Sequence, residues 1–347
     1  MERVATTAAR GRRTFMSDTI RIGVAGLTHG HVGGLIASWE KVPNAKLVAV
    51  ADNTPLMEHH GPKFQRRYQS WREMLDVEEL DALVVTSNNL ESSEIAVEAL
   101  GKGIPCMVEK PMAASYADAQ RMLEAWRKAQ KPLMINWPLA WSPWLHELKR
   151  LLDQGLIGKV FHLRFRNGHH GPKEIGCDPW FVAWLYDEKL NGAGALADFC
   201  GYGAVLCRWY FGLPQSVYAV RDNYTKDYEV PDDHAIVVLR YPKLTCILEG
   251  TWATFGFDRS ANPVVHGKEG TFGVYGNDVV LFRAGQEEVH HESPALSIDN
   301  PAEYFLRCMQ TGHCPGGILH PEVAADACKI IDAAKESARA GKEVPLA

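Results

Sequence analysis

Five short apolar runs alternate with helix-forming segments between residues 20 and 136. The apolar runs lie at residues 22–25, 47–51, 83–86, 106–109 and 133–136, and the helical patterns lie at residues 31–39, 71–75, 91–100 and 116–129. Strands that are apolar throughout are buried on both faces, which is typical of a parallel sheet covered by helices on each side. The first part of the chain is therefore expected to form a doubly wound α/β domain.

The remaining residues are expected to form a second domain around another sheet. β-Branched runs separated by turns lie at residues 160–166, 217–221, 235–241 and 244–252, and helices are indicated at residues 143–152, 195–210, 301–308 and 321–340. A chain of 347 residues is long enough for two domains with sizeable cores. We expect a flexible tail at residues 1–18, a first domain at 19–138 and a second at 139–347.

Composition and charge exclude several classes of function. A formal net charge of −5 argues against nucleic-acid binding, and no apolar stretch approaches the roughly 18 residues of a membrane helix. Eight scattered cysteines without a C-x-x-C pair indicate the reduced thiols of a cytoplasmic protein. The spacing of Cys308, His313 and Cys314 does not match a zinc knuckle, so no metal is expected. Arg12 and Arg13 resemble the start of a twin-arginine signal, but no hydrophobic stretch follows, so export is not expected.

The turn after the first apolar run carries an incomplete phosphate-binding pattern. A G-x-G-x-x-G loop at this place would bind a pyrophosphate at the helix N-terminus. The chain keeps Gly26 but has Thr28 and His31 at the other two glycine positions. The hydroxyl of Thr28 and the imidazoles of His29 and His31 can still donate hydrogen bonds to phosphate. Binding at this turn is therefore expected despite the altered pattern.

Asp52 ends the second apolar run, where a carboxylate in a dinucleotide-binding domain accepts hydrogen bonds from the adenosine ribose. That carboxylate would repel a 2′-phosphate, and the neighbouring Asn53 and Thr54 bring no positive charge. The cofactor is therefore expected to be NAD, with Asn53 beside it, and NADP is less favoured. The alternative interpretation is that Asp52 only caps a turn.

Glu109, Lys110 and Pro111 follow the fourth apolar run. They therefore lie at the carboxyl end of a buried strand, where ligands bind in open α/β sheets. An ammonium group at this place can hold a substrate oxygen while that oxygen gains or loses charge. The alternative is a surface lysine that precedes a helix.

Taken together, these segments resemble the glucose–fructose oxidoreductase / inositol dehydrogenase / rhizopine-catabolism (Gfo/Idh/MocA) family of NAD(P)-dependent oxidoreductases. The matching pieces, in the order of the family, are residues 22–26, 52, 81–88, 109–111, 192–202, 266–271 and 300–337. The resemblance implies a Rossmann domain followed by an α/β domain with an open, largely antiparallel sheet. It also implies hydride transfer between a nicotinamide and a hydroxyl of a sugar or polyol, and a homodimer or homotetramer formed through that sheet.

The resemblance also assigns individual residues. It places Lys110 between the nicotinamide ribose and the substrate, and Asp198 in a hydrogen bond with the substrate. Further positions would border the cofactor: Thr86, Asn88, Glu109 and Asn136.

Tyr202 stands where the family usually has histidine. Asp198 and Tyr202 are four positions apart, so they are expected on one face of a helix. Phenol titrates near 10 and histidine near 6.5, but the ammonium of Lys110 would lower the pKa of a nearby phenol. The hypothesis is that Tyr202 acts as the acid/base or as a hydrogen-bond donor; the alternative is a tyrosine packed in a helix.

Four further residues are candidates near the substrate. His169 and His170 follow the first apolar run of the second domain and could supply a base or bind sugar hydroxyls, or they could lie in a solvated loop. Trp180 and Trp184 precede Asp198, and one of their indoles could pack against a sugar ring. Core packing is the alternative for both tryptophans.

Three functions agree with this pattern. The leading one is NAD-dependent oxidation of a secondary hydroxyl on a sugar, glycoside or cyclitol, or the reverse reduction. The second is a glycosidase that retains NAD and works by transient oxidation and elimination. The third is a non-catalytic NAD or sugar sensor, because the family includes a transcriptional repressor; the presence of both Lys110 and Asp198 argues against it.

Overall fold

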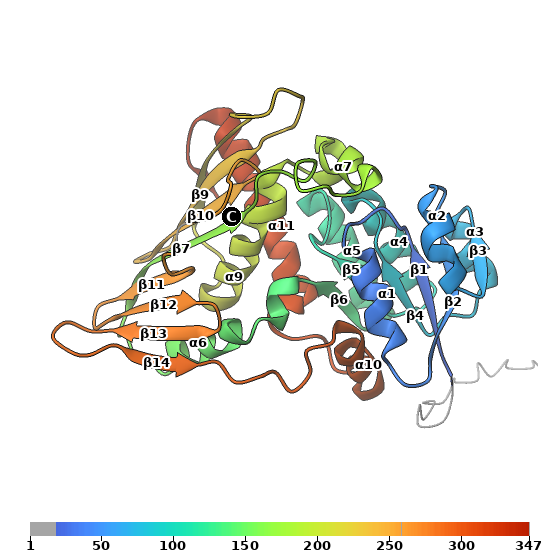
Figure 1. The fold of residues 1–347 in the computed structure, drawn as a ribbon, viewed down its shortest axis with the longest axis horizontal. Coiled ribbons are helices and arrows are strands. Elements are labelled where there is room, and N and C mark those ends of the chain that lie inside the picture. The colour runs from blue at the N-terminus through green and yellow to red at the C-terminus, as the bar shows by residue number, and fades with distance from the viewer. Residues whose placement is uncertain (1–18, 258, 347) are drawn as a thin grey trace, which may run out of the picture.

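The computed structural model describes residues 19–257 and 259–346, so the tail expected at residues 1–18 lies outside the described residues. The fold has two α/β units that lie side by side, and each unit is built around one sheet (Figure 1). The long helix α11 (Pro321–Ala340) lies between them and contacts both α5 (Tyr116–Ala129) and the second sheet. The expected two-part α/β architecture is confirmed.

The first sheet has six parallel strands in the order β3-β2-β1-β4-β5-β6. Their bounds are β1 Ile20–Ala25, β2 Ala45–Ala51, β3 Arg66–Tyr68, β4 Ala82–Val85, β5 Cys106–Glu109 and β6 Leu133–Asn136. Every residue of β4, β5 and β6 is buried, including Glu109 and Asn136, the polar residues that end β5 and β6. The short edge strand β3 has the sequence Arg-Arg-Tyr and gave no apolar signal.

Helices pack along this sheet (Figure 1). They are α1 Val32–Glu40, α2 Leu56–His60, the 3₁₀ turn η1 Gly61–Lys63, α3 Trp71–Val77, α4 Asn89–Gly101 and α5 Tyr116–Ala129. The start of α5 is fixed by Ser115, whose hydroxyl accepts a hydrogen bond from the backbone N–H of Asp118 at 3.2 Å. Asn88 caps α4 in the same way, since its side chain accepts from the N–H of Glu91 at 2.9 Å.

The second sheet has nine strands in the order β14-β13-β12-β11-β7-β10-β9-β8-β15. Their bounds are β7 Val160–Gly168, β8 Ser216–Asp222, β9 His234–Arg240, β10 Thr245–Thr251, β11 Val264–Gly267, β12 Thr271–Tyr275, β13 Asp278–Phe282, β14 Val289–Glu292 and β15 Val344–Pro345. Among the described residues, β7 and β10 are parallel and the other neighbouring strands are antiparallel. The expected open, largely antiparallel sheet is confirmed, although strands β11 to β14 were not anticipated.

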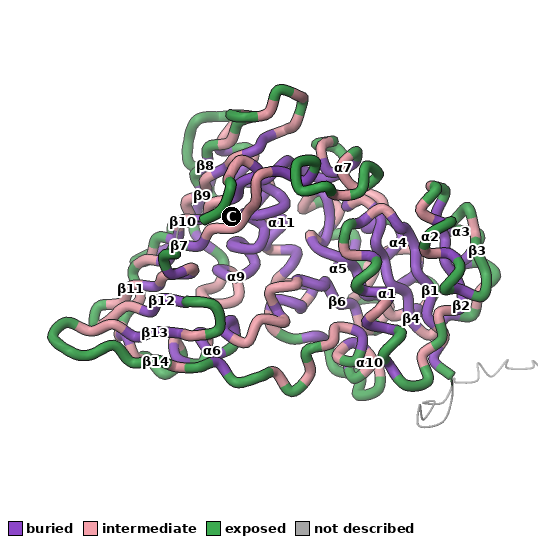
Figure 2. The backbone as a smooth tube through the Cα atoms, in the orientation of Figure 1, coloured by how far each residue is buried: buried purple, intermediate pink, exposed green. Residues whose placement is uncertain are grey.

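Helices cover one face of this sheet. The remaining helical segments are η2 Pro138–Trp141, α6 Pro143–Asp153, α7 Pro179–Leu185, α8 Glu188–Asn191, the π-helix η3 Leu196–Cys200, α9 Gly201–Phe211, α10 Pro301–Thr311, η4 Gly317–Leu319 and α11. On the covered face α9 contacts β10, and α11 contacts β8. The opposite face leaves alternate side chains of β8 such as Tyr218 and Val220 exposed. Figure 2 shows how buried and exposed residues are distributed along the whole backbone. Within the described part of the chain, no helix combines the length and apolarity needed to span a bilayer.

Candidate active site

Lys110 and Asp198 meet between the two domains. Lys110 directly follows β5, and Asp198 lies in the π-helix η3. The Nζ atom of Lys110 is 2.6 Å from Oδ1 of Asp198, and the residues are 4% and 7% exposed. Because 88 positions separate them in the sequence, the fold alone brings the ammonium and carboxylate together.

Trp252 holds the other oxygen of this carboxylate. Its indole Nε1 donates a hydrogen bond to Oδ2 of Asp198 at 3.1 Å, and its side chain is fully buried directly after β10. Trp252 was not among the residues predicted from the sequence. The available signal was an indole placed at the end of a β-branched run, but with ten tryptophans in the chain that signal was weak.

The electrostatics of the pair favour the charged forms. Burial, the largest single effect, lowers the pKa of the Lys110 ammonium, but the charge and hydrogen bond of Asp198, together with Tyr202 and Glu109, outweigh it and the pKa is raised. Burial raises the pKa of the Asp198 carboxyl, but Lys110 and the hydrogen bond from Trp252 outweigh it and hold the pKa below its usual value. The pair therefore remains ionised at neutral pH.

Tyr202 packs beside Lys110, as its position in the sequence suggested. The Nζ atom of Lys110 lies 4.9 Å from the centroid of the Tyr202 ring, within the range of a cation–π contact. Burial raises the pKa of the Tyr202 phenol to about 12, although Lys110 acts in the opposite direction. Lys110 thus lowers this pKa as expected, but the loss of hydration on burial outweighs the ammonium and the net pKa of the phenol is raised. Asp198 and Tyr202 belong to two successive elements, η3 and α9.

The two loop histidines differ in their surroundings. The ring of His169 packs edge-on against Phe199 at 5.1 Å, and its Nδ1 accepts the backbone N–H of Gly171 at 3.0 Å. The neutral ring therefore carries its proton on Nε2. Burial lowers the pKa of His169, although the charge of Asp198 partly opposes this effect. His170 instead stacks its ring on Phe255 at 5.2 Å, and Phe255 is exposed.

The glycine turn after β1 approaches the adjacent strand end very closely. Gly26 has φ +82°, and a Cβ atom there would lie 2.6 Å from the backbone of Ser87. The Oγ1 atom of Thr86 donates to the carbonyl of Gly26 at 2.5 Å, and the carbonyl of Thr86 accepts the N–H of His29 at 3.0 Å. Gly26 is therefore required by both conformation and space, and Thr86 supports the turn.

Asp52 fixes the same turn from the end of β2. Its Oδ2 accepts the backbone N–H of Leu27 at 2.7 Å, and its Oδ1 accepts the N–H of Thr54 at 2.6 Å. The carboxylate thus caps two turns, which agrees with the alternative interpretation that Asp52 caps a turn. The same carboxylate lies at the end of β2, where the ribose of a dinucleotide is expected. Asn53 beside it is exposed.

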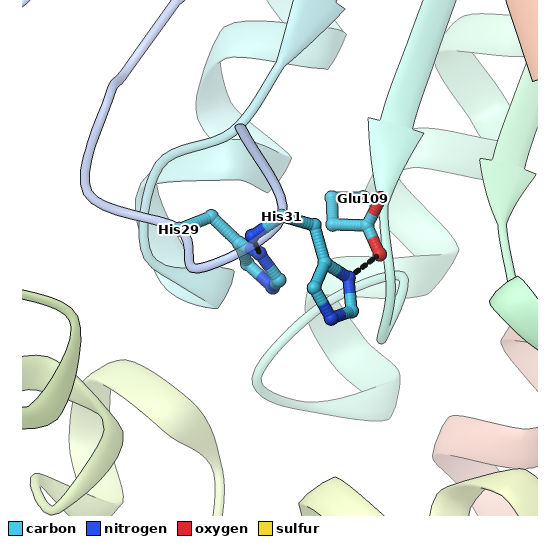
Figure 3. A group of neighbouring side chains, drawn as sticks. All are labelled: His29, His31 and Glu109. Carbon is cyan, nitrogen blue, oxygen red and sulfur yellow. Dashed lines mark hydrogen bonds and ion pairs between the residues drawn. The ribbon is translucent and has the colours of Figure 1, made fainter. Parts of the chain in front are cut away.

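His29, His31 and Glu109 form a cluster between the glycine turn and β5 (Figure 3). Nδ1 of His29 accepts the backbone N–H of His31 at 3.1 Å, and its Nε2 donates to the carbonyl of Lys110 at 3.3 Å. Nδ1 of His31 lies 2.8 Å from Oε1 of Glu109, and Oε2 of Glu109 accepts from Nδ2 of Asn136 at 2.7 Å.

The same cluster has the residue types of a metal site, with ligand atoms within 4.8 Å of one another. Those atoms already bond to one another or to the backbone, which explains the arrangement of His29 and His31 without an ion. Burial, with the nearby His31 and Lys110, lowers the pKa of His29, so this buried ring is neutral. His29 thus connects the glycine turn directly to the backbone of the lysine.

Helix α7 of the second domain covers this turn. The rings of Phe181 and Trp184 lie 5.3 Å and 5.7 Å from that of His29, and Nε1 of Trp184 donates to the carbonyl of Thr28 at 3.3 Å. Trp184 is therefore buried against the glycine turn, as the core-packing alternative held. Trp180, one helical turn earlier, is exposed.

The fold and site define a class of protein: a Rossmann domain with a buried lysine at a strand end, joined to a second sheet domain that supplies a carboxylate. Residues 20–137 match the model of the oxidoreductase family with an NAD-binding Rossmann fold, and residues 145–273 match the GFO/IDH/MocA C-terminal domain. The chain belongs to the GFO/IDH/MocA family of oxidoreductases, as the resemblance indicated.

Several relatives are dehydrogenases. The chain is 28% identical over 127 residues to D-apiose dehydrogenase of Paraburkholderia graminis, a match that covers 36% of this chain and 34% of the relative. It is 24% identical over 250 residues to myo-inositol 2-dehydrogenase of Thermotoga maritima, covering 69% and 71%. A solved structure of levoglucosan dehydrogenase with NADH and levoglucosan has a TM-score of 0.80 at 18% identity and covers 95% of this chain and 100% of that chain. The match to the apiose dehydrogenase thus spans about a third of that protein's length.

Proposed function

We propose that this protein is an NAD-dependent oxidoreductase that interconverts a secondary hydroxyl of a sugar, glycoside or cyclitol and the corresponding carbonyl. The observation that carries this proposal is the buried 2.6 Å pair of Lys110 and Asp198 at the carboxyl end of β5. His29 connects the backbone of Lys110 to the glycine turn, so the reacting groups and the nucleotide turn form one site. The names of the relatives, which are dehydrogenases of apiose and inositol, agree with this class of substrate.

The residues present fit NAD. Gly26 makes the turn between β1 and α1, where a Rossmann domain binds a pyrophosphate, and Asp52 places a carboxylate at the end of β2 that would accept ribose hydroxyls and repel a 2′-phosphate. Bound NAD would accept the hydrogen of the substrate carbon with its electron pair, which converts the alcohol to a carbonyl. Further residues are proposed to border the cofactor: Thr28, His29, His31, Asn53, Thr86, Asn88, Glu109, Lys110 and Asn136.

Lys110 and Asp198 would orient the reacting hydroxyl. The ammonium donates a hydrogen bond to the substrate oxygen and stabilises the negative charge that develops there, while the carboxylate accepts from a hydroxyl. Their opposite charges cancel, which suits a neutral polyol. His169 would donate its Nε2–H to another hydroxyl, and the half-buried His170 and the exposed Trp180 remain candidates for outer contacts.

Tyr202 is proposed as the acid/base. With a pKa of about 12, its phenol is protonated at neutral pH, so it can give a proton to the oxygen when a carbonyl is reduced. Oxidation requires the phenol to lose that proton first, so the rate of oxidation should rise with pH over the alkaline range. Tyr202→Phe should lose both this rise and most of the turnover; a variant with full turnover would refute the assignment and leave His169 as the alternative.

The open face of the second sheet is proposed to form a homodimer or homotetramer. Exposed apolar side chains, among them Tyr218 and Val220, lie on this face. A cytoplasmic location is proposed from the eight free cysteines. The division into residues 19–138 and 139–347 is likewise a proposal; α10 and α11 belong to the second part but contact α1 and α5 of the first.

The test is to measure bound nicotinamide spectroscopically in the purified protein and to follow NADH absorbance with a sugar panel that includes apiose, inositol and levoglucosan. Turnover with net NADH formation, strongly reduced in Lys110→Met, is the expected result. Release of sugar without net NADH would indicate the glycosidase, and NAD binding without turnover across the panel would indicate the sensor.

A further inference from the structure

Two adjacent aspartates that directly precede β9 are fully buried, although neither belongs to the site described above. Asp232 and Asp233 are each 0% exposed, and a buried carboxylate is costly unless it is fully hydrogen-bonded. Asp232 accepts hydrogen bonds from three groups: the N–H of Gly194 at 3.0 Å, the N–H of Leu196 at 2.7 Å and the guanidinium of Arg221 at 3.0 Å. The local fold thus places this charge where it binds one particular backbone segment.

That segment leads directly into the element that carries Asp198. The backbone carbonyl of Asp232 also accepts the N–H of Ala195 at 3.1 Å, so three consecutive amides, those of Gly194, Ala195 and Leu196, bind this one residue. A Cβ atom at Gly194 would lie 2.1 Å from that carbonyl, so the approach is as close as a glycine allows. The π-helix begins at Leu196, and Asp198 lies in its first turn.

Asp233 holds Trp252, which is the hydrogen-bond partner of the Asp198 carboxylate. Its backbone carbonyl accepts the N–H of Trp252 at 2.6 Å, and the indole of Trp252 binds Oδ2 of Asp198. Its side chain binds the N–H groups of Tyr224 and Thr225, each at 2.8 Å. The pair therefore restrains Asp198 from both sides: Asp232 through the backbone, and Asp233 through the indole.

We infer that Asp232 is a positioning residue for the reaction, which acts by holding the start of the π-helix so that Asp198 meets both Lys110 and Trp252. The expected loss of kcat rests on the proposed function. The placement of Asp198 rests on the hydrogen bonds alone. A displacement of about 1 Å in a reacting group can cost about 100-fold in rate. Substrate affinity supplied by other contacts, and the nucleotide turn in the first domain, do not depend on Asp232.

The experiment compares Asp232→Asn with Asp81→Asn in the full-length chain. Asp81 is a suitable control because its carboxylate also accepts a backbone N–H, that of Arg21 at 2.9 Å, and a guanidinium at 3.1 Å, but at the amino end of β4, opposite the strand ends that carry Lys110 and Asp52. We expect Asp232→Asn to lower kcat about 10- to 100-fold with less than about a threefold change in KM and in the Kd for NAD. Asp81→Asn should keep kcat, measured with both variants well below their melting temperatures.

A second readout does not require turnover. The indole ¹H–¹⁵N resonance of Trp252, assigned by its loss in Trp252→Phe, reports the hydrogen bond to Asp198. It should move in Asp232→Asn and stay in place in Asp81→Asn. A kcat in Asp232→Asn within twofold of the control, or an unmoved indole resonance, would overturn the inference.

The outcomes also separate the two proposals. Failure of the wild-type protein to turn over any sugar would refute the proposed function, while the indole resonance would still decide the role of Asp232. Should Asp232→Asn fail to fold, the same comparison is made with the guanidinium partners, Arg221→Gln against Arg21→Gln. The first should then lower kcat and move the resonance; equal behaviour of the two would refute the positioning role.

Discussion

The two sheets contribute to the site in different ways. In the first sheet, Lys110 and Asp52 directly follow the carboxyl ends of parallel strands. The common direction of these strands alone places both residues at the same end of the sheet. The second delivers Asp198 from a π-helix held by distant hydrogen bonds to Asp232 and Trp252. The first half therefore depends on strand geometry, and the second on a network of long-range contacts.

The largest effect is expected from breaking the contact between the halves. Lys110→Met should lower kcat/KM by about 10²- to 10³-fold, because the developing charge on the substrate oxygen loses its ammonium donor. It should also lower the free energy of unfolding by about 3–5 kcal/mol, because Asp198 remains buried without its counter-ion. Steady-state kinetics and urea unfolding measure the two losses.

Two controls sharpen this result. Lys102→Met removes a surface ammonium of the same domain and should leave kcat unchanged. The double variant Lys110→Met/Asp198→Leu removes both charges, so it should recover much of the stability but none of the activity. If Lys110→Met alone has a normal kcat, Lys110 does not take part in the reaction.

The next effect tests the network on the second side. Trp252→Phe keeps most of the buried ring but removes the indole donor to Oδ2 of Asp198. A hydrogen bond to a charged group is worth about 1.5–3 kcal/mol, so we expect kcat to fall about 10- to 100-fold while the Kd for NAD, measured by fluorescence titration, stays constant. An equal loss of NAD affinity would mean that the two halves are not separable in this way.

A smaller effect is expected in the first domain, where NAD affinity should fall while kcat stays constant. Asp52→Asn removes the negative charge from the end of β2 but keeps an acceptor for the N–H of Leu27. We expect NAD to bind about 10-fold more weakly and the preference for NAD over NADP to narrow, since the amide no longer repels a 2′-phosphate. Titration with both cofactors measures the change, and kcat at saturating NAD should not move.

The smallest effect is the pH dependence of stability that His29 produces. Its pKa is lowered in the folded protein, whereas in the unfolded chain it is near 6.5. Below about pH 6.5 the unfolded chain therefore binds a proton that the folded protein does not, and stability falls by up to about 1.4 kcal/mol per pH unit. His29→Gln should flatten this slope in thermal unfolding.

His290 offers a control, because its pKa is shifted in the opposite direction from that of His29. Hydrogen bonds to Asp278 and Glu288 raise the pKa of the exposed His290, so His290→Gln should not flatten the acid slope. If His29→Gln and His290→Gln behave alike, the buried ring next to Lys110 is not the group that titrates.

The pattern of apolar runs predicted the first sheet well because each strand there is buried on both faces. The exception, β3, is a polar edge strand. In the second sheet the predicted strands β7 to β10 carry long β-branched runs, whereas β11 to β14 are only four or five residues long. Short strands offer too few alternations to be recognised from their pattern.

The amino-acid sequence by itself determined the Rossmann domain, the end of β5 as the place of Lys110, and the turn after β1 and the end of β2 as the places of Gly26 and Asp52. These follow from local periodicity and from the direction of parallel strands. Only the tertiary structure decided that Trp252 and Asp232 hold Asp198, that Trp184 covers the glycine turn, and that Tyr202 has a raised pKa. Hydrogen bonds across long sequence distances and the loss of hydration on burial depend on which segments pack together, and no local pattern in the chain records that.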